Sequence, residues 1–358
     1  MSNVSLDVPF SPIPFRARDQ VHLVYELFIH NASGQELKLS RVEAASLDAG
    51  VPPLAVLEAG EIEENVRYLT DHLRPADEQV FKSGTLACVY LWLKLASETP
   101  LPASLSHKVS YTMEDSTEDQ GVLKAVPVQT ILPLVLSPPL RGKKWLAGNA
   151  PSNSVGHRRT IIPLDLQPHI TQRFAVDWVQ FGEDGMLFEG DSSENNNWYG
   201  YGAELLAVAD GMVTEVQDGI IENVPLSGEM AIEINIESAP GNYVLLDLGD
   251  ENFALYAHML PNSLQVKVGE RVQRGQVLGR MGNSGNSDAP HLHFHIGNRN
   301  AALAAQGVPY IFKSFELLDT IEDVEILLEE GKPWQPKAQK KPENRTCESV
   351  LENDVVNF

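Results

Sequence analysis

A run of alternating histidines is the feature of this sequence that points most directly to chemistry. His291, His293 and His295 are separated by Leu292 and Phe294. Because residues i, i+2 and i+4 of a β-strand point to the same side, the three imidazoles should share one face of a strand. A neutral imidazole is a common zinc ligand and also carries protons near neutral pH. The pattern therefore predicts a metal or acid–base site, since each buried ring would otherwise need its own polar partner.

The composition restricts the class of protein. A chain of 358 residues, 43% of them hydrophobic, is long enough for about two domains with their own cores. With 27 Lys and Arg against 49 Asp and Glu, the formal net charge is −22. This charge argues against nucleic acid or an anionic membrane surface as the main partner. The two cysteines, Cys88 and Cys347, indicate neither a disulfide framework nor a thiolate metal site.

The sequence shows no membrane-spanning segment and no visible signal peptide. No stretch approaches the roughly 18 continuous apolar residues of a transmembrane helix. Residues 1–20 also lack the basic start and apolar core of a secretory signal. We therefore expect either that the chain stays inside the cell or that its numbering begins after a removed signal.

The first part of the chain, residues 1–140, is predicted to be an accessory β-domain. Residues 21–29 and 85–95 are rich in β-branched and aromatic side chains, and residues 31–34 supply a turn. Several short strands separated by turns favour an immunoglobulin-like β-sandwich. Histidines of this region lack the spacing of metal ligands and are expected to be structural; they are His22, His30, His72 and His107.

The second part, residues 141–320, is also predicted to be β-structure, so the whole chain is expected to be all-β. Residues 242–248 and 253–259 are predicted to form a β-hairpin around a Gly-Asp-Glu-Asn turn. Residues 195–202 mix amides, aromatics and glycines, which suits either a groove-lining loop or an ordinary surface loop. Residues 321–358 are polar and charged and are expected to form a mobile C-terminal tail.

Several motifs of the second part resemble a known enzyme family. Tyr256-Ala-His258-Met, a glycine-punctuated stretch at 268–279, Gly282-Asn-Ser-Gly-Asn-Ser and His291-Leu-His293-Phe follow one another in this order. Together they resemble the M23 (lysostaphin-like, LytM-type) zinc metallopeptidases, over residues 173–296. The resemblance implies an antiparallel β-domain of that family, a Zn²⁺ cofactor and a peptide substrate from the bacterial cell wall. It also implies action outside the cytoplasmic membrane, in the periplasm or as a secreted protein.

The resemblance also implies roles for individual residues. His293 and Asp177 would be ligands of the zinc ion. His258 and His291 would be the paired catalytic histidines that polarise the attacking water or the developing oxyanion. Tyr256, in the tyrosine-x-histidine motif, would contact substrate or support the site. Three protein ligands and an open position for water form a zinc site suited to hydrolysis.

One position departs from the family pattern. The family places a ligand histidine four residues before the aspartate, where this sequence has Arg173. An arginine is always protonated and cannot bind zinc. We expect His157 to supply the missing ligand from a strand beside that of Asp177, although a degenerate site without metal stays open. His169 is a poor substitute, because an extended chain would place it too far from Asp177.

Two further residues have alternative roles at this stage. Arg173 is expected either to hold a substrate carboxylate through paired hydrogen bonds or to form a structural ion pair. His295 stands where the family often has glutamate, and it is expected to support a metal ligand or to line the groove rather than to bind the metal.

The predicted function is that of a zinc-dependent metalloendopeptidase acting on peptidoglycan cross-links. The first alternative is a catalytically degenerate binding or activator module of cell-wall hydrolases, which Arg173 keeps open. The second is a carrier domain, since residues 266–279 resemble the strand-glycine-strand pattern of biotinyl and lipoyl domains. That alternative is disfavoured because those domains need a lysine at an exposed hairpin tip, typically in a Met-Lys pair, and this stretch contains no such pair.

Overall fold

The computed structural model describes residues 3–48, 52–70, 73, 80–164, 167–322, 324, 327, 332–336 and 341–358. Within these residues the regular secondary structure consists almost entirely of β-strands, which confirms the all-β prediction. The chain divides into two compact units. The first consists of Met1–Pro133 and Ile161–His169, and the second consists of Leu134–Thr160 and Ile170–Phe358. The second unit thus begins at Leu134, earlier than the predicted boundary at residue 141.

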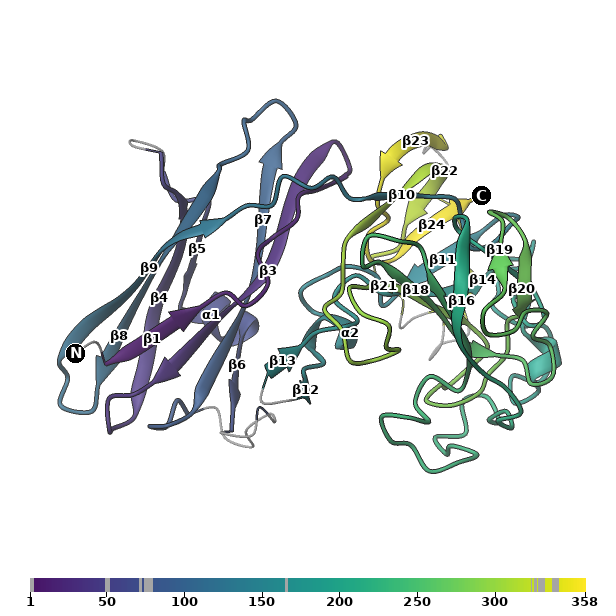
Figure 1. Ribbon diagram of the computed structural model, residues 1–358, viewed down its shortest axis with the longest axis horizontal. Helices are drawn as coiled ribbons and strands as arrows, with labels where there is room; N and C mark the ends of the chain where they lie inside the picture. Colours follow the sequence, from purple (N-terminus) through teal and green to yellow (C-terminus); the bar gives the residue numbers. More distant parts are fainter. Residues whose placement is uncertain are drawn as a thin grey trace. The chain divides into compact units, whose positions relative to one another are not determined.

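The first unit contains two antiparallel sheets (Figure 1). One sheet consists of β1 (Val4–Asp7), β2 (Phe15–Ala17), β3 (Gln20–Asn31), β6 (Val66–Leu69) and β7 (Leu86–Ala96). The other consists of β4 (Leu37–Ser46), β5 (Ala55–Glu58), β8 (Ser104–Met113) and β9 (Glu118–Pro127). Side chains of both sheets, such as Leu27 of β3 and Val109 of β8, share one buried core. The unit is therefore a β-sandwich, whereas its immunoglobulin-like topology stays a prediction.

Small elements complete the first unit. The helix α1 (Ala59–Asn65) joins β5 to β6, and its first turn carries a capping box between Glu58 and Glu61. A two-stranded hairpin of β12 (Ile162–Leu164) and β13 (Gln167–His169) also belongs to this unit. His72, one of the four histidines expected to be structural, lies outside the described residues.

The second unit is built on one large sheet and a small one. The large sheet runs β10-β22-β24-β11-β14-β21-β18-β17-β16-β19, with β23 also paired to β22. Its strands are β10 (Leu134–Leu136), β11 (Trp145–Gly148), β14 (Val176–Gln180), β16 (Gly211–Gln217), β17 (Asn242–Asp247), β18 (Phe253–Met259), β19 (Arg271–Val272), β21 (Leu292–Gly297), β22 (Tyr310–Thr320), β23 (Glu343–Glu348) and β24 (Asp354–Asn357). The small sheet pairs β15 (Glu204–Leu206) with β20 (Val277–Arg280).

Four neighbouring strands of the large sheet position the site. β11, β14, β21 and β18 lie side by side in this order (Figure 1). Their register places Gly148 opposite Asp177, Asp177 opposite His293, and His293 opposite Ala257. Because directly opposed residues point to the same face with Cβ atoms about 5 Å apart, this row brings Asp177 and His293 together. Phe294 points to the other face, where its ring packs on Tyr310.

The hairpin predicted at residues 242–259 is confirmed. β17 and β18 pair antiparallel, and the Leu248 N–H donates to the Asn252 carbonyl across the turn at 2.9 Å. This hairpin brings His258, at the end of β18, next to the histidine strand β21.

The C-terminal segment differs from the mobile tail that was expected. β24 pairs with both β11 and β22, and Val355 and Val356 are buried. Among the described strands, β23 pairs with β22 alone, so its polar residues suit the edge of a sheet. The polar composition thus reflects an edge strand and its connections, and the apolar pair Val355-Val356 anchors the chain end. Across the described ranges, no helix has the length and apolar character needed to cross a membrane.

Candidate metal centre

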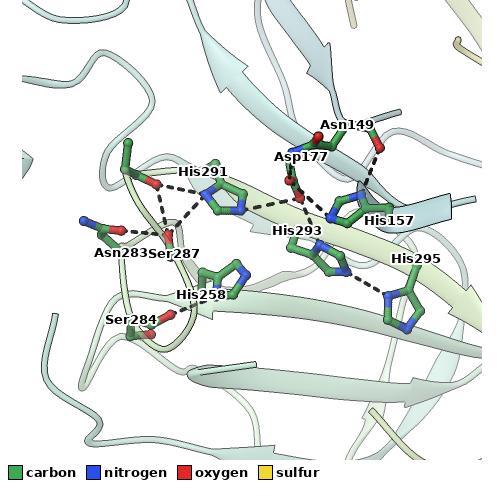
Figure 2. Close-up of polar contacts among 11 residues, drawn as sticks. Asn149, His157, Asp177, His258, Asn283, Ser284, Ser287, His291, His293 and His295 are labelled. Atoms are coloured by element: carbon green, nitrogen blue, oxygen red, sulfur yellow. Dashed lines mark hydrogen bonds and ion pairs between the residues drawn. The ribbon is translucent and has the colours of Figure 1, made fainter. Parts of the chain in front are cut away.

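Three imidazoles converge on the carboxylate of Asp177 (Figure 2). His293 Nδ1 lies 2.9 Å from Oδ1, and His291 Nε2 lies 3.4 Å from the same oxygen. His157 Nε2 lies 3.3 Å from Oδ2. The side chains of Asp177, His157 and His293 are 13%, 14% and 4% exposed, so the group is largely shielded from solvent while remaining reachable.

His157 reaches Asp177 from a helical turn and not from the adjacent strand that was expected. It lies in α2 (Gly156–Arg159), and the strand beside β14 is β11. The preceding segment favours a turn because its polar side chains bond locally, as in the contact of 3.0 Å between Ser152 Oγ and Ser154 Oγ. The prediction that His157 lies on a strand beside that of Asp177 was therefore wrong, although His157 itself does face Asp177.

Backbone carbonyls fix the proton position on three of the rings. In each case Nδ1 lies within 2.9 Å of a carbonyl oxygen and donates its proton there, so Nε2 is left as the free acceptor. The acceptors are Asn149 for His157, Ser284 for His258 and Ala289 for His291. Because Nε2 of neutral His157 then presents a lone pair to an anionic carboxylate, a cation between them is needed to make that contact favourable. Asp177 raises the pKa of His291, so Nε2 of that ring can instead be protonated and donate to the carboxylate.

His293 is supported from behind by His295. Its Nε2 lies 2.9 Å from His295 Nδ1, and the ring of His295 also hydrogen-bonds to the backbone of Ala302. In the neutral form each ring carries one proton, and His295 donates its proton to the Ala302 carbonyl. The single proton of His293 can then be donated either to Asp177 from Nδ1 or to His295 from Nε2, but not to both. A cation bound at Nδ1 of His293 would leave the proton on Nε2, from which it is donated to Nδ1 of His295. Both nitrogens of His293 would then have a partner. His295 thus lies where the prediction of a supporting residue placed it.

The donor set fits a metal ion. One ligand atom each from His157, Asp177 and His293 lie within 4.8 Å of one another. The contacts of 3.3 Å and 2.9 Å between Asp177 and the two rings are close to the edge of a tetrahedron with bonds of about 2.0 Å. Two imidazole nitrogens and a carboxylate oxygen are typical ligands of zinc in a hydrolytic site, which keeps a further position open.

The electrostatics of the group suit this interpretation. Burial opposes the charge of Asp177, but the charges of His157 and His291 and the hydrogen bonds of the rings outweigh it and hold the pKa of that carboxyl well below its usual range. Burial lowers the pKa of His157 to about 4, against the opposing effect of Asp177. Asp177 is therefore anionic and His157 neutral near pH 7, which are the forms that bind metals.

His258 and His291 form a second pair beside the metal ligands, with ring centroids 4.7 Å apart. Burial, followed by the charges of His291 and His293, lowers the pKa of His258 well below its usual value. Burial also opposes charge on His291, but Asp177 outweighs it and raises the pKa of His291. His258 has a φ of +61°, a left-handed conformation that costs about 1–3 kcal/mol for such a residue and is typical of functional sites.

Asn149 is a site residue that the sequence did not indicate. Its Nδ2 donates to Asp177 Oδ2 at 2.9 Å, while its carbonyl accepts from His157. Its φ of +46° lies in the left-handed region that asparagine tolerates better than most residues. One residue directly after β11 therefore orients two of the three candidate ligands. The Gly148-Asn149 pair, at the end of a strand, was the available signal.

The loop at residues 195–202 supports the site indirectly and also reaches the cavity. Asn283 donates to Asn195 Oδ1 at 3.0 Å, and Ser287 Oγ lies 2.7 Å from Asn283 Oδ1 and 3.2 Å from His291 Nδ1. Trp198 is buried and lines the cavity described below. The groove-lining interpretation of this loop agrees with the position of Trp198.

Arg173 does not take the substrate-binding alternative and is held by structural hydrogen bonds, whereas Tyr256 lies elsewhere than its predicted role requires. Arg173 is buried, and its guanidinium donates to the Gly307 carbonyl at 2.9 Å and to Gln306 Oε1 at 2.8 Å. It anchors the chain and does not present its fork to a substrate. Tyr256 is also buried, opposite Phe294, and its hydroxyl accepts from the Val208 N–H at 2.9 Å. Both side chains are structural in this arrangement.

A cavity of about 540 Å³ opens over the histidine cluster. Its wall includes the five residues of the cluster together with apolar and polar side chains of the second unit, among them Trp198, Leu226, Asp288, Leu303 and Glu352. The volume lies within the range of small-ligand sites, and the candidate metal centre lies in its wall.

Comparison with known proteins agrees with the motifs. Residues 199–305 match the model of peptidase family M23, a segment that includes His258, His291 and His293 but not His157 or Asp177. Peptidoglycan DD-endopeptidase ShyA of Vibrio cholerae is 39% identical over 56 residues, which are 16% of this chain and 13% of ShyA. Lysostaphin of Staphylococcus simulans is 29% identical over 121 residues, which are 32% of this chain and 24% of lysostaphin. The chain thus spans about a quarter or less of these relatives.

Solved structures include a zinc-containing peptidase from Vibrio cholerae, 14% identical over 82% of each chain with a TM-score of 0.26. The family match comes from the sequence of residues 199–305, which contains the histidine pattern and the strand that carries it. Residues 199–305, which carry the histidine strand, therefore resemble peptidase family M23 in sequence.

Proposed function

We propose that this chain is a zinc-dependent endopeptidase that hydrolyses peptide cross-links of bacterial peptidoglycan. The observation that carries the proposal is the convergence of His157, Asp177 and His293 within 4.8 Å, beside a second histidine pair and in the wall of a cavity. The match of residues 199–305 to peptidase family M23 supports the reaction class. The substrate rests on the relatives, one of which is a peptidoglycan DD-endopeptidase.

The metal would be held by His157, Asp177 and His293. Zinc bound by them would lower the pKa of a water molecule and polarise the scissile carbonyl. Asn149 would keep His157 Nε2 and Asp177 aimed at the ion, and His295 would do the same for His293. His157 would take the place of the ligand histidine that the family has at the position of Arg173.

His258 and His291 would divide the proton transfers between them. His258, with its proton held on Nδ1 by the Ser284 carbonyl, offers Nε2 as an acceptor for the proton of the attacking water. His291, whose pKa is raised, can hold a proton on Nε2 and donate a hydrogen bond from it to the developing oxyanion. The proton that His258 takes from the water can then pass to the leaving amine. Two titratable groups with pKa values shifted in opposite directions are a common arrangement for acid–base catalysis.

His157 also favours an active site over the alternative of a degenerate activator module. That alternative depended on the metal lacking one ligand, because Arg173 stands at the position of the family's histidine. His157 supplies a ring nitrogen 3.3 Å from Asp177 Oδ2, which would complete the set of three ligands. The work of such an enzyme is outside the cytoplasmic membrane, so we propose an extracytoplasmic location.

Metal analysis combined with hydrolysis of purified sacculi tests the proposal. We expect about one zinc per chain, release of soluble peptide fragments, loss of release after chelation and its recovery on adding zinc. Near-stoichiometric zinc without any hydrolysis would favour the activator module. Absence of bound metal would contradict the ligand assignment itself.

A further inference from the structure

The connection between β23 and β24 brings a carboxyl group into the cavity that the proposed mechanism does not use. The Asn353 N–H donates to the Ala147 carbonyl at 2.9 Å, which docks this connection on the end of β11. The Leu351 N–H donates to the Asp354 carboxylate at 2.9 Å and closes the turn. Glu352, between them, is thereby held in the wall of the cavity.

The two oxygens of Glu352 have different surroundings. The backbone N–H groups of Ala150 and Asn149 hydrogen-bond to the carboxylate. The oxygen Oε2 is shielded from solvent and has no hydrogen-bond partner within the described parts of the chain. A buried acceptor is normally satisfied, so Oε2 is suited to a donor that a ligand would bring.

The charge of the cavity indicates which kind of donor this is. Its described lining contains three carboxyl groups, Asp177, Asp288 and Glu352, and no Lys or Arg. With Asp177 assigned to the metal, Asp288 and the ionised form of Glu352 remain to attract positive charge. A wall of one sign with low-dielectric surroundings concentrates ligands of the opposite sign.

We propose that Glu352 forms a subsite that binds a free ammonium group of the peptide substrate. The proposal rests on the proposed peptidase function and specifies its substrate class as peptides with an unmodified amino group near the scissile bond. An ammonium fits better than a guanidinium, because the planar fork of a guanidinium needs two carboxylate oxygens and backbone amides already engage the carboxylate.

The titration of Glu352 couples its charge to the binding of a cation, because the carboxyl is largely protonated near pH 7 when no cation is bound. Burial, with the nearby charge of Asp177, raises the pKa of Glu352 to about 8, against the hydrogen bonds from the backbone. A cation bound at Asp177 and an ammonium at Oε2 would each favour the ionised carboxylate. Ammonium binding and ionisation of Glu352 would therefore reinforce each other.

The test compares sacculi with free amino groups and sacculi whose amino groups have been N-acetylated. For the zinc-loaded wild-type protein, we expect fragment release to be at least about tenfold faster from the free-amine sacculi, as a charge-assisted hydrogen bond would give. Glu352→Gln, which keeps the shape but not the charge, should bring this ratio close to one while zinc content is kept. Glu251→Gln, an exposed carboxylate in the β17–β18 turn, is the matched control and should keep the wild-type ratio.

Three outcomes would overturn the subsite. The first is equal release by the wild type from free-amine and N-acetylated sacculi, and the second is an unchanged ratio of the two release rates in Glu352→Gln. The third is that Asp288→Asn abolishes the preference for free-amine sacculi while Glu352→Gln does not. Co-sedimentation of the zinc-free protein with the two kinds of sacculi measures binding without turnover. If the zinc-loaded wild type releases nothing from either, the proposed function fails. The subsite is then judged by whether Glu352→Gln, and not Glu251→Gln, abolishes the preference for free-amine sacculi in sedimentation.

Discussion

Both units of this protein bury histidines, but they use them differently. In the first unit, His22 is sealed by two partners, the Ala17 carbonyl at 3.0 Å from Nε2 and the indole N–H of Trp92 at 2.8 Å from Nδ1. His107 Nε2 lies 2.7 Å from the hydroxyl of Tyr25, whose ring also packs against it. Each of these rings is paired with a neighbour of its own, and neither shares its partner with another imidazole.

In the second unit, several rings share one partner. His157, His291 and His293 all approach the carboxylate of Asp177, and carbonyls hold the far nitrogens of His157 and His291. Burial lowers the pKa of His107 to about 4 and that of His157 to about 4 as well. A shifted pKa therefore does not separate the two kinds of histidine. Convergence of ring nitrogens on a shared anion, next to a cavity, does.

The largest effect that this comparison predicts is loss of metal on removing a converging ring. His293→Ala should reduce bound zinc from about one per chain to none and abolish hydrolysis of sacculi, because two ligands hold the ion much more weakly than three. His22→Ala removes a ring that is just as buried and should leave zinc content unchanged. Zinc is measured by elemental analysis, with circular dichroism as the check on folding. Zinc retained in His293→Ala would contradict its assignment as a ligand.

The next largest effect separates catalyst from ligand within the second unit. His291→Ala should keep its zinc and slow hydrolysis by about 10²–10⁴-fold, the usual cost of losing a general acid or base. His157 is one of the three candidate ligands, whereas the ring of His291 pairs with that of His258 beside them. The measurements are zinc content and the initial rate of fragment release. If zinc is lost together with the rate of hydrolysis, His291 is a metal ligand and the separation of catalytic from ligand histidines is wrong.

A smaller effect is expected at Asn149, which supports the site from outside. Asn149→Gly should weaken zinc binding by about 10–100-fold, as for other residues that orient metal ligands. Glycine accepts the left-handed φ and keeps the carbonyl that holds His157, so this change removes only the amide contact with Asp177. Competition with a chromogenic chelator measures the affinity. An unchanged affinity would show that the amide contact does not matter for metal binding.

The parts of the site that the sequence predicts are those set by local alternation. His291, His293 and His295 lie in or next to one strand, and the spacing was enough to place His293 and His295 on one face. The same reasoning fails for Tyr256, because the left-handed φ of His258 breaks the alternation between these two residues. Tyr256 therefore faces Phe294, while His258 turns toward His291.

Residues that arrive from distant segments were beyond local patterns. Asn149 acts through a turn after β11, and Glu352 reaches the cavity only because the β23–β24 connection docks on Ala147. The C-terminal strands were expected to be a mobile tail, since their polar residues resemble a solvated segment when their pairing with β22 is unknown. Arg173 was informative only as the absence of a ligand, and its buried contacts with residues 306 and 307 required the fold.

The smallest predicted effect concerns the first unit and the stability that its isolated histidine gives. The folded pKa of His107 is about 4 and its ordinary value is 6.5, so the unfolded chain binds the proton more tightly. The contribution is therefore fully present above pH 6.5 and is lost as the pH falls from there toward 4. Between pH 7.5 and 5.0 the loss should be about 2 kcal/mol. His107→Gln, which does not titrate, should lack this part of the pH dependence.

Hydrogen exchange of the β8 amides reports on the first unit without interference from metal release in the second. Wild-type protein should lose protection in β8 between pH 7.5 and 5.0, after correction for the intrinsic exchange rate, and the His107→Gln variant should lose less. His22, whose pKa burial also lowers, adds to the remaining loss in both proteins and so cancels in their difference. An equal loss in the two proteins would show that His107 is not the group that titrates. The first unit would then depend on acidity through His22 or its carboxylates, and a perturbed pKa would have failed to identify even the structural histidine that matters.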